Sequence, residues 1–289
     1  MSSTSLFAVT GASGELGRLV VPALAARVGA ANVVAIVRDP AKVAGLFPDG
    51  VTVRAGDYEK PETLAAALAG VERLLLISSN ALGSRVAQHR NVIDAAKAAG
   101  VKRIAYTSVL HADMSVLGLA DEHRQTEALL AASGIPTSLL RNGWYSENYT
   151  ASIPSALANS ALYGAAGEGR ISSAPRGDYA EAAAVALAGD QGALVVHELA
   201  GDGSYTLAEF AGALSSATGR DIPYVNLPEA DYRGALVGAG LPAPVADLLA
   251  DSDAGAAKGA LFDDGGALSK LIGRGTVPVA DSIAAAVKG

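Results

Sequence analysis

The chain has 289 residues, of which half are hydrophobic and 18% are charged, and its formal net charge at pH 7 is −7. This composition indicates a helix-rich globular protein with a sizeable core, and the negative charge argues against nucleic acid or an anionic membrane as a general partner. The sequence contains no cysteine, which excludes disulfides, thiolate metal sites and a cysteine nucleophile.

The first predicted elements are a strand over 6–9, a glycine turn and a helix over 15–27. Gly11 suits the left-handed backbone that leads out of a strand, Gly14 lets the backbone approach a ligand, and Gly17 lets the helix pack closely. A helix N-terminus offers N–H groups and the positive end of its dipole to a phosphate. We therefore expect a dinucleotide at Gly11, Ser13, Gly14, Glu15, Leu16 and Gly17. On this motif alone, an incidental tight turn stays open because the chain has 33 glycines.

Beyond this turn, strands and helices alternate as far as residue 140. Further strands are predicted at 32–37, 51–53, 71–77, 102–106 and 136–140, and further helices from 40, from 61, at 85–99 and at 121–133. The alternation predicts an α/β fold with a doubly wound parallel Rossmann sheet. We place this NAD(P)-binding domain at 1–141.

The alternation breaks after residue 141, and 163–179 has the glycines and proline of a loop. A strand is predicted at 194–199, and a capping box at Thr206 and Glu209 predicts a helix that reaches about residue 217. Short helices are predicted at 229–238, 244–257 and 278–287. We expect a smaller, mostly helical substrate lobe over 142–289, interleaved with the sheet and joined to it without a clear linker.

Neither a targeting segment nor a metal site is expected. The N-terminus lacks a basic region and its apolar run leads directly into the glycine turn, which predicts a first strand and not a signal peptide. The run at 74–77 is too short to span a bilayer, so a cytoplasmic protein is expected. The histidines are far apart and lack paired ligand spacing, at His89, His111, His123 and His197.

In doubly wound sheets the ligand lies at the carboxyl ends of the strands, so the residues after each strand are the candidate site. Arg38 follows the second strand, where an arginine pairs with the 2′-phosphate of NADP, and Lys42 adds a second cation one turn later. These residues predict NADPH as the cofactor, while the neighbouring Asp39 leaves NADH open. Asp57 follows the third strand and is placed for the adenine edge, although helix capping is an equal alternative.

The later strand ends provide hydroxyls, an amide and two aromatic rings. Those after the fourth and fifth strands are expected to line the cofactor or a bound carbonyl, at Ser78, Ser79, Asn80, Thr107 and Ser108. The serines also suit turns. Those after the sixth strand suit a ring-shaped ligand, at Arg141, Asn142, Gly143, Trp144 and Tyr145. The two aromatic residues are equally typical of packing between two lobes.

A resemblance to a known family extends over nearly the whole chain. It rests on motifs in the segments 9–17, 35–40, 56–58, 105–108, 140–148 and 268–274. The chain resembles the NmrA-like, atypical branch of the short-chain dehydrogenase/reductases, and within it the NAD(P)H:quinone oxidoreductases and triphenylmethane dye reductases. The wider superfamily uses a Tyr-x-x-x-Lys pair, in which tyrosine donates the proton. Here Leu119 stands at the tyrosine place and His123 at the lysine place. Quinones accept hydride more readily than ketones, so the lost tyrosine favours a quinone substrate.

These observations predict an enzyme that transfers hydride from NADPH to a small-molecule quinone held by Asn142, Trp144 and Tyr145. His123 is expected to orient the nicotinamide ribose or relay a proton, or else to be a structural histidine. The predicted catalytic residues are thus His123, Asn142 and Tyr145. Two alternatives stay open: a non-catalytic NAD(P) sensor that acts through a protein partner, and a reductase of dyes or other conjugated acceptors. The chain is expected to be a monomer or a homodimer.

Overall fold

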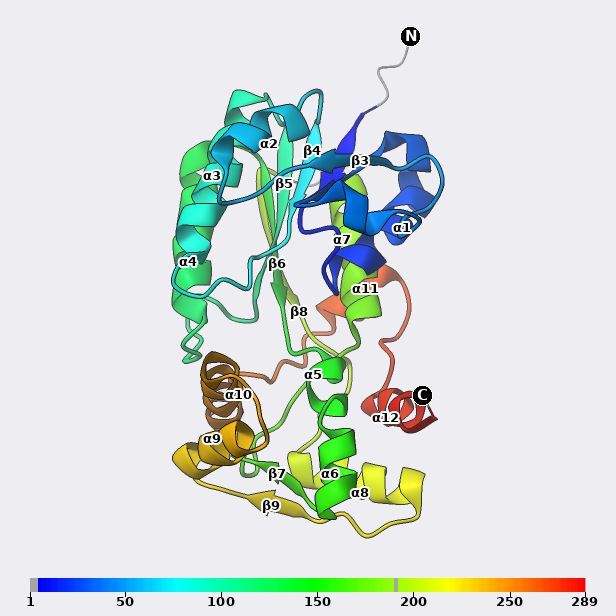
Figure 1. Cartoon of the computed structure of the whole chain (residues 1–289), viewed down its shortest axis with the longest axis vertical. Coiled ribbons are helices and arrows are strands. Elements are labelled where there is room, and N and C mark those ends of the chain that lie inside the picture. The colour runs from blue at the N-terminus through cyan, green and yellow to red at the C-terminus, as the bar shows by residue number, and fades with distance from the viewer. Residues whose placement is uncertain (1–4, 190–191, 289) are drawn as a thin grey trace. The chain divides into compact units, whose positions relative to one another are not determined.

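The computed structural model describes residues 5–189 and 192–288 of the chain (Figure 1). Its main sheet has the strand order β3-β2-β1-β4-β5-β6-β8. The strands are β1 (Phe7–Val9), β2 (Val33–Val37), β3 (Thr52–Ala55), β4 (Arg73–Leu76), β5 (Arg103–Val109), β6 (Thr137–Asn142) and β8 (Leu194–Leu199). Strands β1 to β6 pair in parallel. This confirms the predicted doubly wound sheet, whose strand order reverses between β1 and β4.

Strand β8 runs in the same direction as β6. The N–H of Thr137 donates to the carbonyl oxygen of Ala193 at 2.8 Å, and the N–H of Gly143 donates to that of Leu199 at 2.7 Å. The partners rise together in number, as they do in a parallel pair. The carboxyl ends of all these strands therefore form one edge of the sheet.

Helices cover both faces of the sheet. They are α1 (Gly17–Val28), α2 (Pro61–Ala67), α3 (Arg85–Ala98), α4 (Ala120–Ser133) and α7 (Arg176–Ala188), with short 3-10 turns η1 (Ala30–Asn32) and η2 (Pro40–Val43). Figure 1 shows α2, α3 and α4 on one face and α1 and α7 on the other. Beneath α2 to α4, strand residues such as Ile36, Leu74 and Tyr106 form a buried core with Leu64 and Val92 of the helices. Burial of such side chains stabilises the fold by about 1.5–3 kcal/mol for each one.

Arg73 ties α7 to the sheet. Its Nη1 donates to the carbonyl oxygens of Leu187, Ala188 and Gly189, at 3.2, 3.2 and 2.7 Å. The last carbonyls of a helix have no partner within the helix, and a cation there also suits the negative end of the helix dipole. Arg73 therefore caps α7 from the start of β4.

The chain forms two compact units. The first comprises the chain up to Ala112, Glu122–Asn142 and Arg176–His197, and the second comprises Asp113–Asp121, Gly143–Pro175 and the chain from Glu198 onward. The predicted division at residue 141 lies one residue from the crossing after Asn142. The expected interleaving consists of α7 and most of β8, which belong to the first unit.

The second unit is mostly helical, with α5 (Ser146–Thr150), α6 (Ile153–Asn159), α8 (Leu207–Thr218), α9 (Glu229–Gly238), α10 (Ala243–Ala256), α11 (Ala267–Ile272) and α12 (Val279–Lys288). The capping box is present, because Thr206 and Glu209 each accept from the other's backbone N–H. A small parallel sheet of β7 (Leu162–Gly164) and β9 (Tyr224–Asn226) was not expected. Across 5–189 and 192–288, no helix has the length and hydrophobicity needed to cross a membrane.

The stretch 163–179 was predicted as a loop, but it includes most of β7 and the start of α7. Helix α7 is rich in alanine and buried on most sides. Its hydrophobic periodicity is therefore faint, and strand β7 is only three residues long. Both elements depend on tertiary packing more than on a local pattern.

Candidate cofactor and acceptor site

The glycine turn lies between β1 and α1, at the point where the strand order reverses. Gly11 has φ +59°, a conformation that side chains disfavour. A Cβ on Gly17 would lie 2.3 Å from the carbonyl oxygen of Gly11, and one on Gly14 would lie 3.2 Å from the same atom. The start of α1 thus packs directly on the turn. Gly11, Ser13, Gly14 and Glu15 are exposed, so the turn has an open side for a phosphate.

Tyr58 joins the ends of β1 and β4 beside this turn. Its hydroxyl lies 2.5 Å from Thr10 Oγ1 and 2.9 Å from the carbonyl oxygen of Ile77. The N–H of Ile77 also donates to Thr10 Oγ1, at 3.2 Å. Burial raises the pKa of Tyr58 well above its usual value, so the phenol stays protonated. These contacts give Tyr58 a role in fixing the turn.

The residues after β2 divide into one unpaired cation and one local ion pair. Arg38 is exposed, and within the described part of the chain its side chain has no hydrogen-bond or ion-pair partner. Asp39 accepts the N–H of Ala41 at 3.1 Å and lies 3.6 Å from Lys42 Nζ. The Asp39 carboxylate therefore caps η2, and Arg38 is the side chain open to a ligand. Arg18 on α1, which the sequence reasoning did not select, adds a second exposed cation beside the turn, 3.3 Å from the Ser13 carbonyl oxygen.

Asp57 organises the turn after β3. Its Oδ1 accepts the N–H of Glu59 at 3.1 Å, and its own N–H donates to Thr63 Oγ1 at 2.9 Å. Helix α2 begins with no side-chain cap. Asp57 therefore orders the turn before α2 and does not cap the helix itself.

Thr107 holds the start of the loop after β4. Its Oγ1 accepts the N–H of Ser78 at 2.8 Å. Ser79 Oγ accepts the N–H of Ala81 at 3.1 Å, which matches the turn-forming alternative, while the Asn80 side chain is exposed. Ser78 and Ser79 are half-buried. The structure thus brings the loop after β4 and the Thr107 hydroxyl near the end of β5 together.

Ser108 and Arg141 share a buried partner, Glu127 of α4. Arg141 donates from Nε and Nη2 to the two carboxylate oxygens of Glu127, at 3.0 and 2.8 Å, and the Ser108 hydroxyl donates to Oε1 at 2.6 Å. A two-pronged guanidinium–carboxylate pair is among the strongest polar contacts in proteins. These side chains were predicted to contact the cofactor, but here they bind Glu127.

His123 is also enclosed by protein groups. Its Nδ1 lies 2.8 Å from the Tyr106 hydroxyl and its Nε2 lies 3.3 Å from Arg85 Nη1. Burial, followed by the charge of Arg85, lowers the pKa of His123 to about 3. A guanidinium has no acceptor, so Nε2 accepts and Nδ1 carries the only ring proton. At neutral pH this imidazole has no spare proton, which favours the structural alternative. The predicted proton relay stays a prediction.

Strand β6 ends at Asn142 in the first unit, and the chain that follows it belongs to the second unit. Asn142 is buried, and its carbonyl oxygen accepts the N–H of Leu110 at 2.9 Å. Gly143 and Trp144 are buried in the chain that follows, and Tyr145 is half-buried directly before α5. The carbonyl oxygen of Trp144 accepts the N–H of Ala174 at 3.3 Å. Their predicted contact with an acceptor stays a prediction.

A sequence profile described as NAD(P)H-binding matches residues 11–190. The chain belongs to this family. It is 56% identical over 280 residues to quinone oxidoreductase 2 of Escherichia coli, which covers 96% of this chain and 97% of that protein. A crystal structure of the NADPH-dependent E. coli quinone oxidoreductase in complex with NADPH has a TM-score of 0.94, with 97% of this chain and 99% of that chain covered at 55% identity. The Citrobacter sp. triphenylmethane reductase complexed with NADP(H) has a TM-score of 0.91 at 35% identity, with 97% and 99% covered.

These matches confirm the resemblance drawn from the sequence motifs. The family match begins at Gly11, the first glycine of the turn, and ends in the first unit. The matched residues therefore include the glycine turn and strands β2 to β6, whose carboxyl ends form one edge of the sheet.

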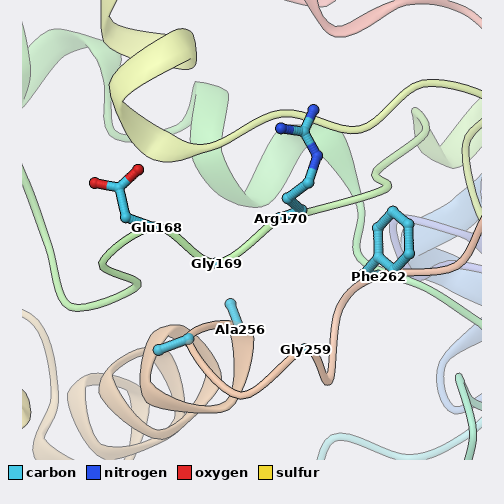
Figure 2. Close-up of a pocket in the computed structure, with 7 residues that line it drawn as sticks. Glu168, Gly169, Arg170, Ala256, Gly259 and Phe262 are labelled. Carbon is cyan, nitrogen blue, oxygen red and sulfur yellow. The ribbon is translucent and has the colours of Figure 1, made fainter.

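The second unit has a cavity of about 350 Å³ of its own (Figure 2). Figure 2 shows Glu168, Arg170 and Phe262 around it, with the end of α10 on one side. Arg170 is held by Ser204, with its Nε 2.8 Å from Oγ and its Nη2 2.6 Å from the carbonyl oxygen. The residues that line this cavity include none of the predicted site residues. Of its two polar side chains, Arg170 is held by Ser204 and Glu168 is open to solvent.

Proposed function

We propose that the protein is an NADPH-dependent quinone oxidoreductase that transfers hydride from the nicotinamide to a small-molecule quinone. The 56% identity to E. coli quinone oxidoreductase 2 along 96% of the chain carries this proposal. The glycine turn and the free Arg38 support it at the level of residues. The expected product pair is the hydroquinone and NADP⁺, with one proton taken up for each hydride transferred.

The first unit fits NADPH at two places. The turn is too tight for a Cβ at Gly17 and tight for one at Gly14, and its exposed side at Gly11, Ser13 and Gly14 is open to a phosphate. The exposed guanidinium of Arg38 offers positive charge to the 2′-phosphate, and Arg18 adds a second cation close to the turn in sequence. The Asp39 carboxylate, which would favour the ribose of NADH, is engaged by η2 and Lys42. NADPH is therefore the expected cofactor, which supplies the hydride when bound.

The chemistry needs little acid catalysis from the chain. Hydride addition to a quinone gives an aromatic anion whose charge is spread over the ring, so it is protonated readily. Leu119 stands where related reductases place the tyrosine acid, and His123 is a neutral imidazole at pH 7, which is too weak an acid to donate its one ring proton. We infer that the protein acts mainly by holding donor and acceptor in position, with Asn142, Trp144 and Tyr145 as the acceptor residues.

Steady-state oxidation of NADPH, followed at 340 nm with a benzoquinone, tests the proposal. We expect turnover that saturates in both substrates. Replacement Arg38→Ala should weaken NADPH binding by at least tenfold more than NADH binding, because only NADPH has the 2′-phosphate. Tight NADPH binding without turnover would overturn the proposed enzymatic activity and favour an NAD(P) sensor. Equal losses of NADPH and NADH affinity in Arg38→Ala would show that Arg38 does not bind the 2′-phosphate.

A second acceptor class deserves the same assay. The Citrobacter protein is a reductase of triphenylmethane dyes, and an NAD(P)H azoreductase of Xenophilus azovorans is 30% identical over 74% of this chain. Both names describe conjugated acceptors. A higher kcat/KM with such a dye than with any quinone would make dye reduction the primary activity.

A further inference from the structure

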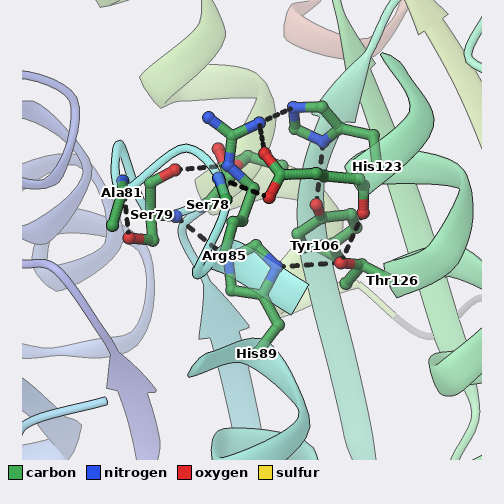
Figure 3. A network of polar contacts seen from close by, with 11 residues as sticks. Ser78, Ser79, Ala81, Arg85, His89, Tyr106, His123 and Thr126 are labelled. Carbon is green, nitrogen blue, oxygen red and sulfur yellow. Dashed lines mark hydrogen bonds and ion pairs between the residues drawn. The ribbon is translucent and has the colours of Figure 1, made fainter. Parts of the chain in front are cut away.

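Ser79, in the loop after β4, has both of its backbone polar atoms held by side chains of one helix. Its N–H donates to His89 Nε2 at 2.9 Å, and its carbonyl oxygen accepts from Arg85 Nε at 2.6 Å. Arg85 and His89 are one turn apart on α3, so they lie on the same helix face. We name these two residues the Ser79 clamp (Figure 3).

The protonation of His89 is set by its neighbours. Nε2 accepts from Ser79, so Nδ1 carries the proton and donates it to Thr126 Oγ1 at 2.9 Å. The Thr126 hydroxyl in turn donates to the carbonyl oxygen of Glu122, at 2.9 Å. Burial, and then the charge of Arg85, lowers the pKa of His89 to about 3. His89 is therefore a permanent acceptor for Ser79 at any pH near neutrality.

Helix α4 supports the other half of the clamp. Glu122 Oε2 lies 3.6 Å from Arg85 Nη1, and Glu122 Oε1 accepts the N–H of Gly83 at 3.0 Å. His123 Nε2 also lies 3.3 Å from Arg85 Nη1, and Figure 3 shows this ring over Tyr106. Glu122 thus fixes Arg85 and the far end of the same loop.

These contacts leave the loop little freedom on its protein side. Thr107 holds Ser78, the clamp holds Ser79 and Glu122 holds Gly83. Between Ser79 and Gly83, the side chain of Asn80 is exposed. The loop lies after β4, beside β1 and its glycine turn, where a dinucleotide binds in sheets of this topology.

We propose that Arg85 and His89 are positioning residues, which fix the Ser79 peptide so that the loop after β4 is preformed for NADPH. The inference rests on the proposed function for the identity of the cofactor. A preformed loop lowers the ordering cost of binding, which a free loop would have to meet each time the cofactor enters. Loss of either clamp residue frees one of the two backbone polar atoms of Ser79, and loss of both frees the two atoms.

Direct titration of NADPH tests the clamp without any acceptor. His89→Leu removes the acceptor for Ser79 and should weaken NADPH binding about tenfold, which corresponds to about 1.4 kcal/mol. His89→Gln keeps an acceptor oxygen and should stay within about threefold of the wild type. Arg85→Lys/His89→Leu should bind NADPH more weakly than His89→Leu alone, because it also removes the Arg85 Nε donor to the Ser79 carbonyl oxygen.

Val92→Ala is the matched control. Val92 is buried in the core one turn further along α3 and has no polar contact with the loop. It should lower Tm at least as much as His89→Leu and leave the Kd for NADPH within twofold. Amide exchange at Ser79 should accelerate only in the His89→Leu protein.

Two results would overturn the clamp: wild-type affinity for NADPH in His89→Leu, or an equal loss of affinity in Val92→Ala at matched Tm. A wild type that binds NADPH and reduces no quinone would remove the proposed function instead. The clamp would still be judged in that case, because the Kd is measured in the absence of a quinone.

Discussion

Each unit of the protein buries a carboxylate, but the two carboxylates are held in opposite ways. In the first unit, Glu127 accepts two hydrogen bonds from Arg141 and one from Ser108. In the second unit, Asp253 accepts only from neutral groups, the Tyr149 hydroxyl at 2.8 Å and the N–H of Ala165 at 2.9 Å. No ion pair to Asp253 is found across residues 5–189 and 192–288.

The difference shows in the protonation of Asp253. Burial raises its pKa to about 6, and its two hydrogen bonds only partly oppose this rise. Tyrosines surround the carboxyl group, and burial, followed by the charge of Asp253, raises the pKa of Tyr149 and Tyr232. A buried carboxylate thus needs a cation if it is to stay ionised without cost, while hydrogen bonds from neutral donors leave it able to titrate.

Replacement Arg141→Met should have the largest effect on stability. It leaves the Glu127 charge buried without its cation, which should lower the free energy of unfolding by about 3–5 kcal/mol at pH 7. Urea denaturation measures this loss. The double variant Arg141→Met/Glu127→Leu should recover a large part of it, since the uncompensated charge is gone. A loss below about 1 kcal/mol in the single variant would mean that the pair is well solvated.

This pair also marks the limit of what the sequence could reveal. The strand ends were predictable because apolar runs and glycine turns place Arg38, Thr107 and Arg141 at one edge of a parallel sheet. The partner of each side chain was not predictable. Arg141 was expected at the cofactor, and its bond to Glu127 depends on how α4 packs against β6.

Contacts between segments far apart in sequence were equally hidden. Asp253 and Tyr149 are 104 residues apart, and nothing in either local pattern connects them. The Ser79 clamp has a faint signal, because Arg85 and His89 are four residues apart on a predicted helix. That both point at one peptide becomes visible only when the loop after β4 is placed.

Replacement Asp253→Asn should change the pH dependence of stability. The folded state binds the Asp253 proton more tightly than the unfolded chain does, so this group favours folding most below about pH 4. That advantage is lost as the pH rises through about 6. The stability of the wild type relative to Asp253→Asn should therefore fall by about 2.4 kcal/mol between pH 4 and pH 8. Urea denaturation of both proteins across this range measures it, and a difference that does not vary with pH would show that Asp253 stays in one protonation state.

Two hydroxyl deletions give the smallest and most closely matched comparison. Tyr149→Phe and Ser108→Ala each remove one donor from a buried carboxylate, and Tyr149→Phe keeps the ring that packs near Phe210. Ser108→Ala should lower the free energy of unfolding by about 1 kcal/mol, because Arg141 still satisfies both oxygens of Glu127.

Tyr149→Phe should lower the free energy of unfolding by about 1.5 kcal/mol at pH 8 and by less at pH 4, since a hydrogen bond to an ionised acceptor is stronger than one to a neutral acid. It should also move the titration of Asp253 to higher pH, because the lost hydrogen bond lowered that pKa. Denaturation curves at the two pH values measure both effects, and an equal cost of Tyr149→Phe at pH 4 and pH 8 would mean that this hydroxyl does not distinguish the charged carboxylate from the neutral acid.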